Sequence, residues 1–159
     1  MAVLQSLSFS GKFLQRGFWL YVWEIETASG DRWLYVGRTG DSSSMNAQSP
    51  FTRLGQHLGT NEHANALRRH LMNVGVNPDV CRSFKMVAYG PILPEGKDID
   101  EHRLRRDKIA AMEKAICDAL GQAGYAVLNR VHCLHLPDDS LWKDTLNAFA
   151  ESFPNLRER

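Results

Sequence analysis

A glutamate beside an apolar stripe is the first residue whose type and position suit chemistry. One predicted helix carries apolar side chains at helical spacing, at Ile109, Met112, Ile116 and Leu120. Glu113 follows Ile109 by one helical turn and lies within or beside this stripe. Because an unpaired buried carboxylate costs several kcal/mol, Glu113 requires a cationic partner. A salt bridge and a metal ion both meet that requirement, and spacing alone favours a salt bridge to a nearby arginine.

Two further pairs of residues could take part in the same chemistry. Arg53 and His57 lie one turn apart in another predicted helix, so they project from one face. A guanidinium beside an imidazole suits an anionic phosphate and a proton transfer. Tyr21 and Tyr35 lie in predicted strands, and a phenol with an ordinary pKa of about 10 needs nearby cations, such as Arg38 and Arg53, to act as a base. The ordinary alternatives are a solvated helix face for Arg53 and His57 and core packing for the tyrosines.

Two short strand motifs in this chain resemble those of the GIY-YIG nuclease superfamily. Trp19-Leu20-Tyr21 stands in the place of the first motif, with Trp19 where glycine is usual. Tyr35-Val36-Gly37 stands in the place of the second, and a basic residue, Arg38, follows it. The loop that comes next is longer than in compact members of the family.

The resemblance continues through the helices in family order, up to Arg130. The family's helical arginine and the histidine one turn later fall on Arg53 and His57. Its metal-binding glutamate falls on Glu113, and its downstream asparagine falls on Asn129. The resemblance implies that Glu113 holds Mg²⁺ or Mn²⁺, that Arg53 neutralises charge on the phosphoryl oxygens, and that Asn129 orients the site.

The function that this resemblance implies is metal-dependent endonucleolytic hydrolysis of phosphodiester bonds in DNA. Either Tyr21 or Tyr35 would activate the attacking water with help from His57. We favour Tyr21, because it is expected in the middle of the first strand. Two alternatives stay open from the sequence: a nucleic-acid-binding module of the same fold with little or no cleavage, and an effector that cleaves RNA.

The elements that must position these residues are predicted from hydrophobic periodicity and turn residues. Their order predicts one α+β domain over residues 1–159, with a small antiparallel or mixed sheet flanked by helices. The nuclease-like core would span about 18–130, and an extra C-terminal helix, about 138–153, would pack on the core or pair with another copy. Strands are predicted at 18–26 and 32–38, which form a hairpin, and at 81–89 and 125–129. Helices are predicted from Ser49-Pro50, at 64–74, at 99–123 and from Asp138. The last of these helices should face inward with Trp142, Leu146, Phe149 and Phe153.

Composition limits what can be claimed about partners and location. With 19 Lys and Arg against 18 Asp and Glu, the net charge is +1, so affinity for nucleic acid must come from a local site. The three cysteines are an odd number without a CxxC pair, which indicates free thiols in a reducing compartment. No signal peptide or membrane-spanning stretch is visible. We therefore expect a cytoplasmic protein that binds DNA or RNA and no membrane, with a homodimer or a separate protein selecting the substrate.

Three other features have competing interpretations. His132, Cys133 and His135 resemble a zinc corner, but no second ligand pair has zinc-finger spacing, so we interpret them as a strand end. The basic run 102–108 fits a track for a DNA backbone or a solvated helix face equally well. Core packing is favoured over base stacking for three tryptophans: Trp19, Trp23 and Trp33.

Overall fold

A three-stranded antiparallel sheet forms the centre of the protein in the computed structural model, which describes residues 1–157. The strands are β1 (Phe18–Glu26), β2 (Arg32–Arg38) and β3 (Ser83–Leu93), in the order β2-β1-β3. The predicted hairpin of β1 and β2 is confirmed, with Tyr21 opposite Gly37. Central strand β1 is buried on both faces, which explains its unbroken run of apolar and aromatic residues.

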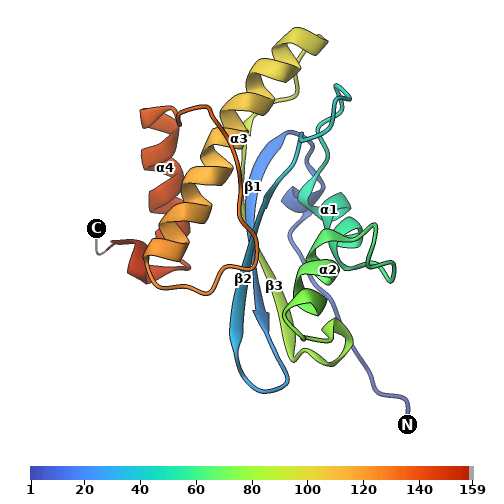
Figure 1. Ribbon diagram of the computed structural model, residues 1–159. Coiled ribbons are helices and arrows are strands. Elements are labelled where there is room, and N and C mark those ends of the chain that lie inside the picture. Colours follow the sequence, from blue (N-terminus) through green and yellow to red (C-terminus); the bar gives the residue numbers. More distant parts are fainter. Residues whose placement is uncertain (158–159) are drawn as a thin grey trace.

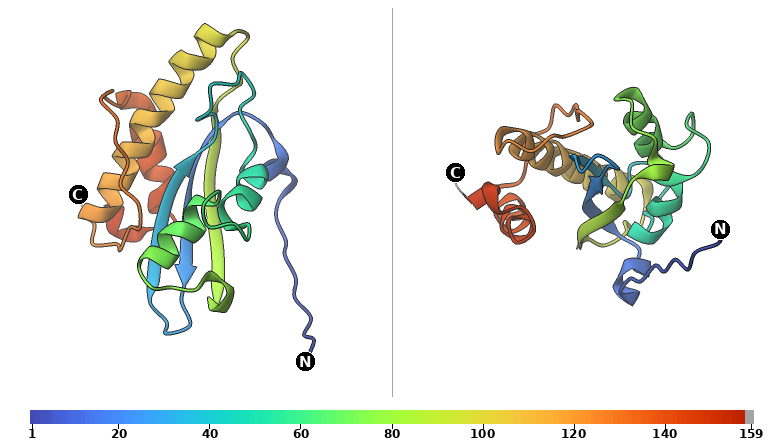
Figure 2. Two further views of the ribbon diagram at one scale, coloured as in Figure 1. Left: turned by 45° about the vertical axis from the view of Figure 1, so that its right-hand side comes forward. Right: turned by 90° about the horizontal axis from the view of Figure 1, so that it is seen from below.

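Helices cover both faces of the sheet, so the fold has three layers (Figures 1 and 2). Helices α1 (Pro50–Leu58) and α2 (Ala66–Asn73) pack against one face, and α3 (Ile99–Gln122) and α4 (Asp139–Ala150) pack against the other. Alternate residues of β1 separate the two cores. Phe18, Leu20 and Val22 join the α3 and α4 side, and Tyr21, Trp23 and Ile25 join the α1 and α2 side. The predicted α+β class is confirmed.

The longest helix and the C-terminal helix bury the side chains that their periodicity indicates. All four stripe residues of α3, from Ile109 to Leu120, are fully buried, and Glu113 lies beside them. Phe149 of α4 is also fully buried, while Trp142 and Leu146 are half-buried. The C-terminal helix therefore packs on the core of its own chain. Within residues 1–157, no helix combines the length and the apolar surface that a membrane crossing requires.

Strand β3 differs from its predicted bounds of 81–89. It begins at Ser83 and continues to Leu93, through Gly90 and Pro91. Glycine and proline usually mark the end of a strand, because proline cannot donate to a ladder. As an edge strand, however, β3 needs partners on only one side, so it tolerates this pair. Proximity to β1 in the fold therefore overrides the local signal.

The predicted strand at 125–129 is wrong. The segment meets β2 at a single parallel bridge between Leu34 and Val127. The Leu34 N–H donates to the Ala126 carbonyl at 2.8 Å, and the Leu128 N–H donates to the Leu34 carbonyl at 2.8 Å. Beyond this point the backbone ladder stops because a side chain, that of Asn129, takes over the pairing. The following residues, 130–135, form no strand either, so the predicted strand end at His132 is also wrong.

Three short 3₁₀ helices complete the described chain: Gly11–Leu14, Pro78–Val80 and Pro154–Arg157. The segment before the first of them is extended, and its end projects from the body (Figure 1). The preference for core packing of the tryptophans is confirmed. Trp19 and Trp23 are buried, and Trp33 is half-buried.

Candidate active site

The last residue of β2, Arg38, connects two groups of polar side chains. Its Nε donates to Glu113 Oε2 at 2.9 Å, on the face that α3 covers. Its backbone carbonyl accepts a hydrogen bond from the Tyr21 hydroxyl at 3.3 Å, on the face that α1 covers. The side chains of Arg38 and Glu113 each retain 15% exposure. The salt bridge that the helical spacing favoured for Glu113 is therefore present, and it brings residues 75 positions apart together.

The Tyr21 hydroxyl is the centre of the second group. It lies 2.6 Å from His57 Nε2 and accepts from Arg53 Nε at 3.2 Å. Gly37 makes this position possible, because a Cβ on that residue would lie 2.6 Å from the Tyr21 hydroxyl oxygen. Steric contact with Tyr21 thus explains why the second motif has a glycine at this position. It lets the Tyr21 side chain cross β2 and reach helix α1.

Burial keeps the phenols and the imidazole of this group uncharged at neutral pH. Burial raises the pKa of Tyr21, although Arg53 opposes the rise. Burial also raises the pKa of Tyr35 to about 12, with Glu113 adding to the effect. Burial lowers the pKa of His57 to about 4, with Arg53 contributing. The cations expected to stabilise a tyrosine phenolate are nearby, but desolvation has the larger effect on the pKa of both tyrosines.

Arg53 is fixed on three sides. Besides donating from Nε to Tyr21, it donates from Nη1 to Gln56 Oε1 and from Nη2 to Asp41 Oδ2, both at 2.8 Å. Asp41 belongs to the loop between β2 and α1, and its side chain is 41% exposed. The buried ring of His102, from the start of α3, donates from Nε2 to the neighbouring Ser42 carbonyl at 3.1 Å. The loop therefore brings an anion to the arginine that the motif identified.

The two tyrosines differ in access to solvent. Tyr21 is fully buried, whereas Tyr35 retains 7% exposure, and its hydroxyl has no hydrogen-bond partner within residues 1–157. The Tyr35 ring lies against two imidazoles, with centroid distances of 5.1 Å to His57 and 5.5 Å to His70. His70 comes from α2 and is half-buried. Of the two phenols, Tyr35 is therefore the one that an external molecule can reach.

Asp41 and His70 are the two members of this site that the sequence did not reveal. Asp41 stands among serines in a loop without periodicity. His70 lies in α2, where only the apolar positions carry a clear pattern. Neither residue has a motif or a spacing that links it to Arg53 or Tyr35. Only the packing of α2 and of the loop around the end of β2 places Asp41 and His70 in the site.

Asn129 acts on the backbone of β2. Its Oδ1 accepts from the Val36 N–H at 3.0 Å, and its Nδ2 donates to the Val36 carbonyl at 2.8 Å. The amide thus imitates a neighbouring peptide group and holds the strand just before Gly37 and Arg38. Cys117 of α3 donates weakly from Sγ to the Asn129 carbonyl at 3.4 Å. Asn129 therefore fixes the backbone of β2 next to the residues of the candidate site.

Glu113 could hold a divalent cation together with water and substrate. Within residues 1–157 only its Oε2 accepts a hydrogen bond, from Arg38, which leaves Oε1 for another ligand. No group of three His, Cys, Asp or Glu side chains in this part of the chain forms a ready metal site. Mg²⁺ keeps several waters and often uses one or two carboxylates plus substrate phosphate, so a single hard oxygen donor fits it.

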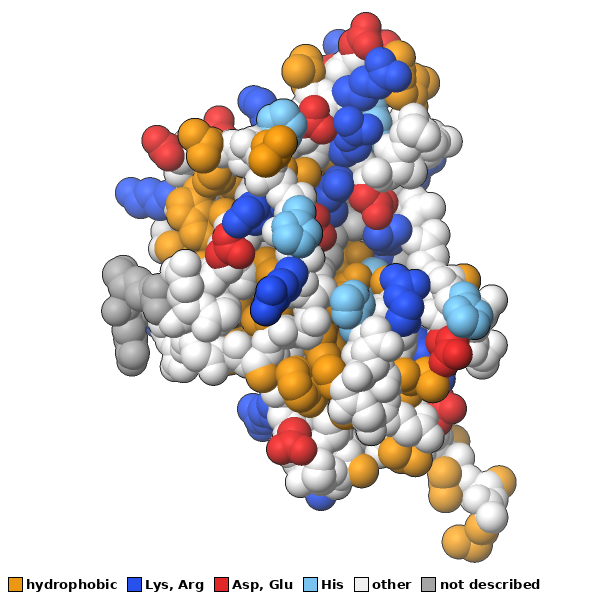
Figure 3. Space-filling model, viewed as in Figure 1, with side chains coloured by type: hydrophobic (Ala, Val, Ile, Leu, Met, Phe, Trp, Pro, Cys, Tyr) orange, Lys and Arg blue, Asp and Glu red, His pale blue; other side chains and the backbone are white. Residues whose placement is uncertain are grey.

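In the basic run 102–108, all three arginines form ion pairs with nearby acidic side chains. Arg105 donates to the Pro94 and Glu95 carbonyls and pairs with Glu101. Lys108 is exposed. Arginine and lysine side chains appear along the face that carries α3 and β2, with acidic side chains among them (Figure 3).

Comparisons with known protein families, with curated proteins and with solved structures found no significant match.

Proposed function

We propose that this protein is a metal-dependent endonuclease of the GIY-YIG type that hydrolyses phosphodiester bonds in DNA. The observation that carries the proposal is the junction at Arg38. There, the Arg38–Glu113 pair from the α3 side meets the Tyr21–His57–Arg53 group from the α1 side. These residues also stand in the order of the family motifs, although they come from four separate elements.

Within this proposal, the open side of the site receives the scissile phosphate. Arg53 and Arg38, with side chains 16% and 15% exposed, offer guanidinium groups to its oxygens. The charge on those oxygens grows as the attacking water adds, and fixed arginines stabilise it without reorganising. A phosphate would compete with Asp41 for Arg53 Nη2.

The residues that handle the water and its proton lie next to this position. The Tyr35 hydroxyl orients the water by hydrogen bonding as a neutral phenol. Burial and Arg69 lower the pKa of His70, so its neutral imidazole can accept the proton that the water loses. The new bond is from water oxygen to phosphorus, the bond to the 3′ oxygen breaks, and that oxygen takes a proton from solvent. Tyr21 and His57, both sealed from solvent, act as positioning residues for Arg53.

A divalent cation fits at Glu113. Mg²⁺ or Mn²⁺ bound there would polarise the phosphate and stabilise charge on the leaving oxygen. The Arg38 side chain fixes the Glu113 carboxylate that would hold the ion.

The test is cleavage of supercoiled plasmid and of structured RNA with Mg²⁺, with Mn²⁺ and with EDTA. Glu113→Gln should abolish cleavage and keep the fold, whereas Glu151→Gln, a matched change at an exposed glutamate, should have no effect. Arg53→Lys should reduce turnover on the order of 100-fold or more, because a point charge cannot replace a planar fork of donors.

The outcomes separate the candidate functions. Full activity of Glu113→Gln with Mg²⁺ would remove this residue from the chemistry. Cleavage of RNA alone would identify an RNA-cleaving effector. If the wild type binds DNA but cuts nothing with any metal, and Glu113→Gln and Arg53→Lys bind equally well, the protein is a binding module.

A further inference from the structure

Most arginines of this protein are neutralised by carboxylates. Within residues 1–157, eight arginines form ion pairs with Asp or Glu side chains. The four that have no acidic partner in this range are Arg32, Arg69, Arg130 and Arg157. Because the net charge of the chain is only +1, these uncompensated guanidinium groups show where an anion can bind.

Two of these four arginines, Arg69 and Arg130, lie on opposite sides of β2. Arg69 is an exposed residue of α2, and its charge opposes the rise in the pKa of Tyr35 and lowers the pKa of His70, so its guanidinium lies beside both. Arg130 is also exposed, and it directly follows Asn129, whose amide pairs with the backbone of β2. Helix α2 and the segment around Arg130 stand on either side of β2 in Figures 1 and 2. The stretch of β2 that carries Tyr35 therefore lies between the two arginines.

Both guanidinium groups retain free donors. Arg69 uses one N–H, donating from Nη1 to the His63 carbonyl at 3.1 Å. The Arg130 guanidinium makes no hydrogen bond or ion pair with any side chain of the described chain. A guanidinium presents five N–H groups in a planar fork, which matches two oxygens of a phosphate.

A polar hollow of about 500 Å³ lies beside Arg130, between α3 and the segment that follows it. Asn129, Arg130 and His132 line it from the segment, and Lys114 lines it from α3, where it pairs with Asp118. The volume is in the range of sites for small organic ligands, which suits one nucleotide. A strand held by Arg130 thus has room on this side of β2.

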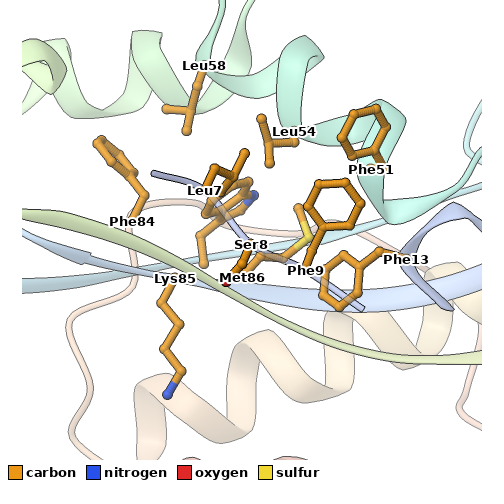
Figure 4. Close-up of a pocket in the computed structure, with 11 residues that line it drawn as sticks. Leu7, Ser8, Phe9, Phe13, Phe51, Leu54, Leu58, Phe84, Lys85 and Met86 are labelled. Atoms are coloured by element: carbon orange, nitrogen blue, oxygen red, sulfur yellow. The ribbon is translucent and has the colours of Figure 1, made fainter. Parts of the chain in front are cut away.

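The apolar pocket between α1, β3 and the N-terminal segment offers an anion no such partners (Figure 4). The one charged residue in its lining is Lys85, whose side chain points away from the other lining side chains. A phosphate there would lose its water without gaining a partner, which is costly. An anion therefore binds more favourably at the hollow beside Arg130.

We propose that Arg69 and Arg130 bind the sugar–phosphate backbone of one DNA strand on opposite sides of the scissile bond. The strand runs from α2, across the stretch of β2 that carries Tyr35, to the hollow beside α3. Phosphates neutralised in this way supply affinity without reading the base sequence. This inference rests on the proposed function, because it takes DNA as the substrate and adds the path of its backbone.

The test is the salt dependence of DNA binding, measured in EDTA so that no cleavage occurs. The protein is titrated into a fluorescein-labelled duplex of about 20 base pairs at salt concentrations from about 50 to about 200 mM. Arg69→Gln and Arg130→Gln should each reduce the slope of log K against log salt by about 0.9, because each loses one neutralised phosphate. Each change should weaken binding about five- to tenfold at about 0.1 M salt, and the double variant should lose about 1.8 of the slope.

Three further variants separate charge from folding and from position. Arg69→Lys and Arg130→Lys should keep the wild-type slope, because a lysine neutralises the same phosphate. Arg157→Gln is the matched control, since Arg157 is exposed and has no acidic partner within residues 1–157. It ends the last 3₁₀ helix, beside α4 and away from α2 (Figure 1), so its loss should leave the slope unchanged. Unchanged melting temperatures would show that all variants are folded.

The outcomes distinguish this inference from the proposed function. If the wild type cuts DNA but Arg69→Gln and Arg130→Gln keep its slope, the inference is overturned and the nuclease stands. If the slopes fall as expected but DNA is never cut, the inference stands and the protein is a binding module. The inference is equally overturned if the wild type does not bind the duplex, or if Arg157→Gln lowers the slope as much. Competition by poly-glutamate as strong as that by unlabelled DNA would also overturn it, because an acidic polypeptide would then be the partner.

Discussion

Replacing Tyr21 by phenylalanine tests whether its hydroxyl holds α1 to the sheet. The change removes the contact to His57 Nε2 at 2.6 Å and the hydrogen bonds to Arg53 Nε at 3.2 Å and to the Arg38 carbonyl at 3.3 Å, inside a fully buried site. Two neutral bonds contribute about 1 kcal/mol each and one charge-assisted bond about 1.5–3 kcal/mol, so we expect a loss of about 3–5 kcal/mol in unfolding free energy. Tyr35→Phe is the matched control, and it should cost less than about 1 kcal/mol because its hydroxyl has no partner within residues 1–157.

Urea denaturation of both variants near neutral pH measures these free energies, and equal m-values would show that the folded and unfolded states are comparable. The ranking should reverse for the chemical step. In single-turnover cleavage, Tyr35→Phe should lose most of the rate while keeping its stability and its affinity for DNA. Equal losses of stability in the two variants, or a loss below about 0.5 kcal/mol for Tyr21→Phe, would refute the assignment of Tyr21 as a structural centre.

Three further results are expected. The unfolding free energy should fall as pH drops from about 6.5 to about 4, because the unfolded state binds a proton at His57 that the folded state resists. The slope of unfolding free energy against pH is at most about 1.4 kcal/mol per pH unit. Denaturation of a His57→Gln variant should show a smaller slope. Gly37→Ala should destabilise the protein by about 1–3 kcal/mol through its clash with Tyr21. Gly55→Ala is the control: it has open space around its Cβ and should leave the melting temperature unchanged or higher. Equal effects of the two changes would contradict the steric argument. Asp41→Asn should tighten DNA binding severalfold in a fluorescence titration, because it removes an anion that competes for Arg53; weaker binding would instead mean that Asp41 positions this arginine.

Local pattern determined most of the architecture of this chain. The run from Phe18 to Glu26 predicted a strand, and the period of Ile109, Met112, Ile116 and Leu120 predicted the buried side of α3. Such patterns are decisive because burial of a whole face contributes much more than any single contact. The same pattern identified Glu113 as a carboxylate that needs a cation, and spacing alone indicated an arginine as that partner.

Tertiary structure decided everything that depends on contacts between distant segments. Glu113 pairs with Arg38 because the end of β2 reaches α3. Asp41 and His70 join the site only through the packing of the loop before α1 and of helix α2. The segment at 125–129 had the composition of a strand, but pairing requires a neighbouring edge in register, and Asn129 satisfied that edge with its side chain.

The difference between the two tyrosines was also beyond the sequence, which favoured Tyr21 as the residue that activates water. Both stand in similar apolar strands, and only the packing of α1 shows which hydroxyl is sealed and which is open. Burial is a property of the assembled layers, because a side chain loses its solvent only when residues from other elements cover it.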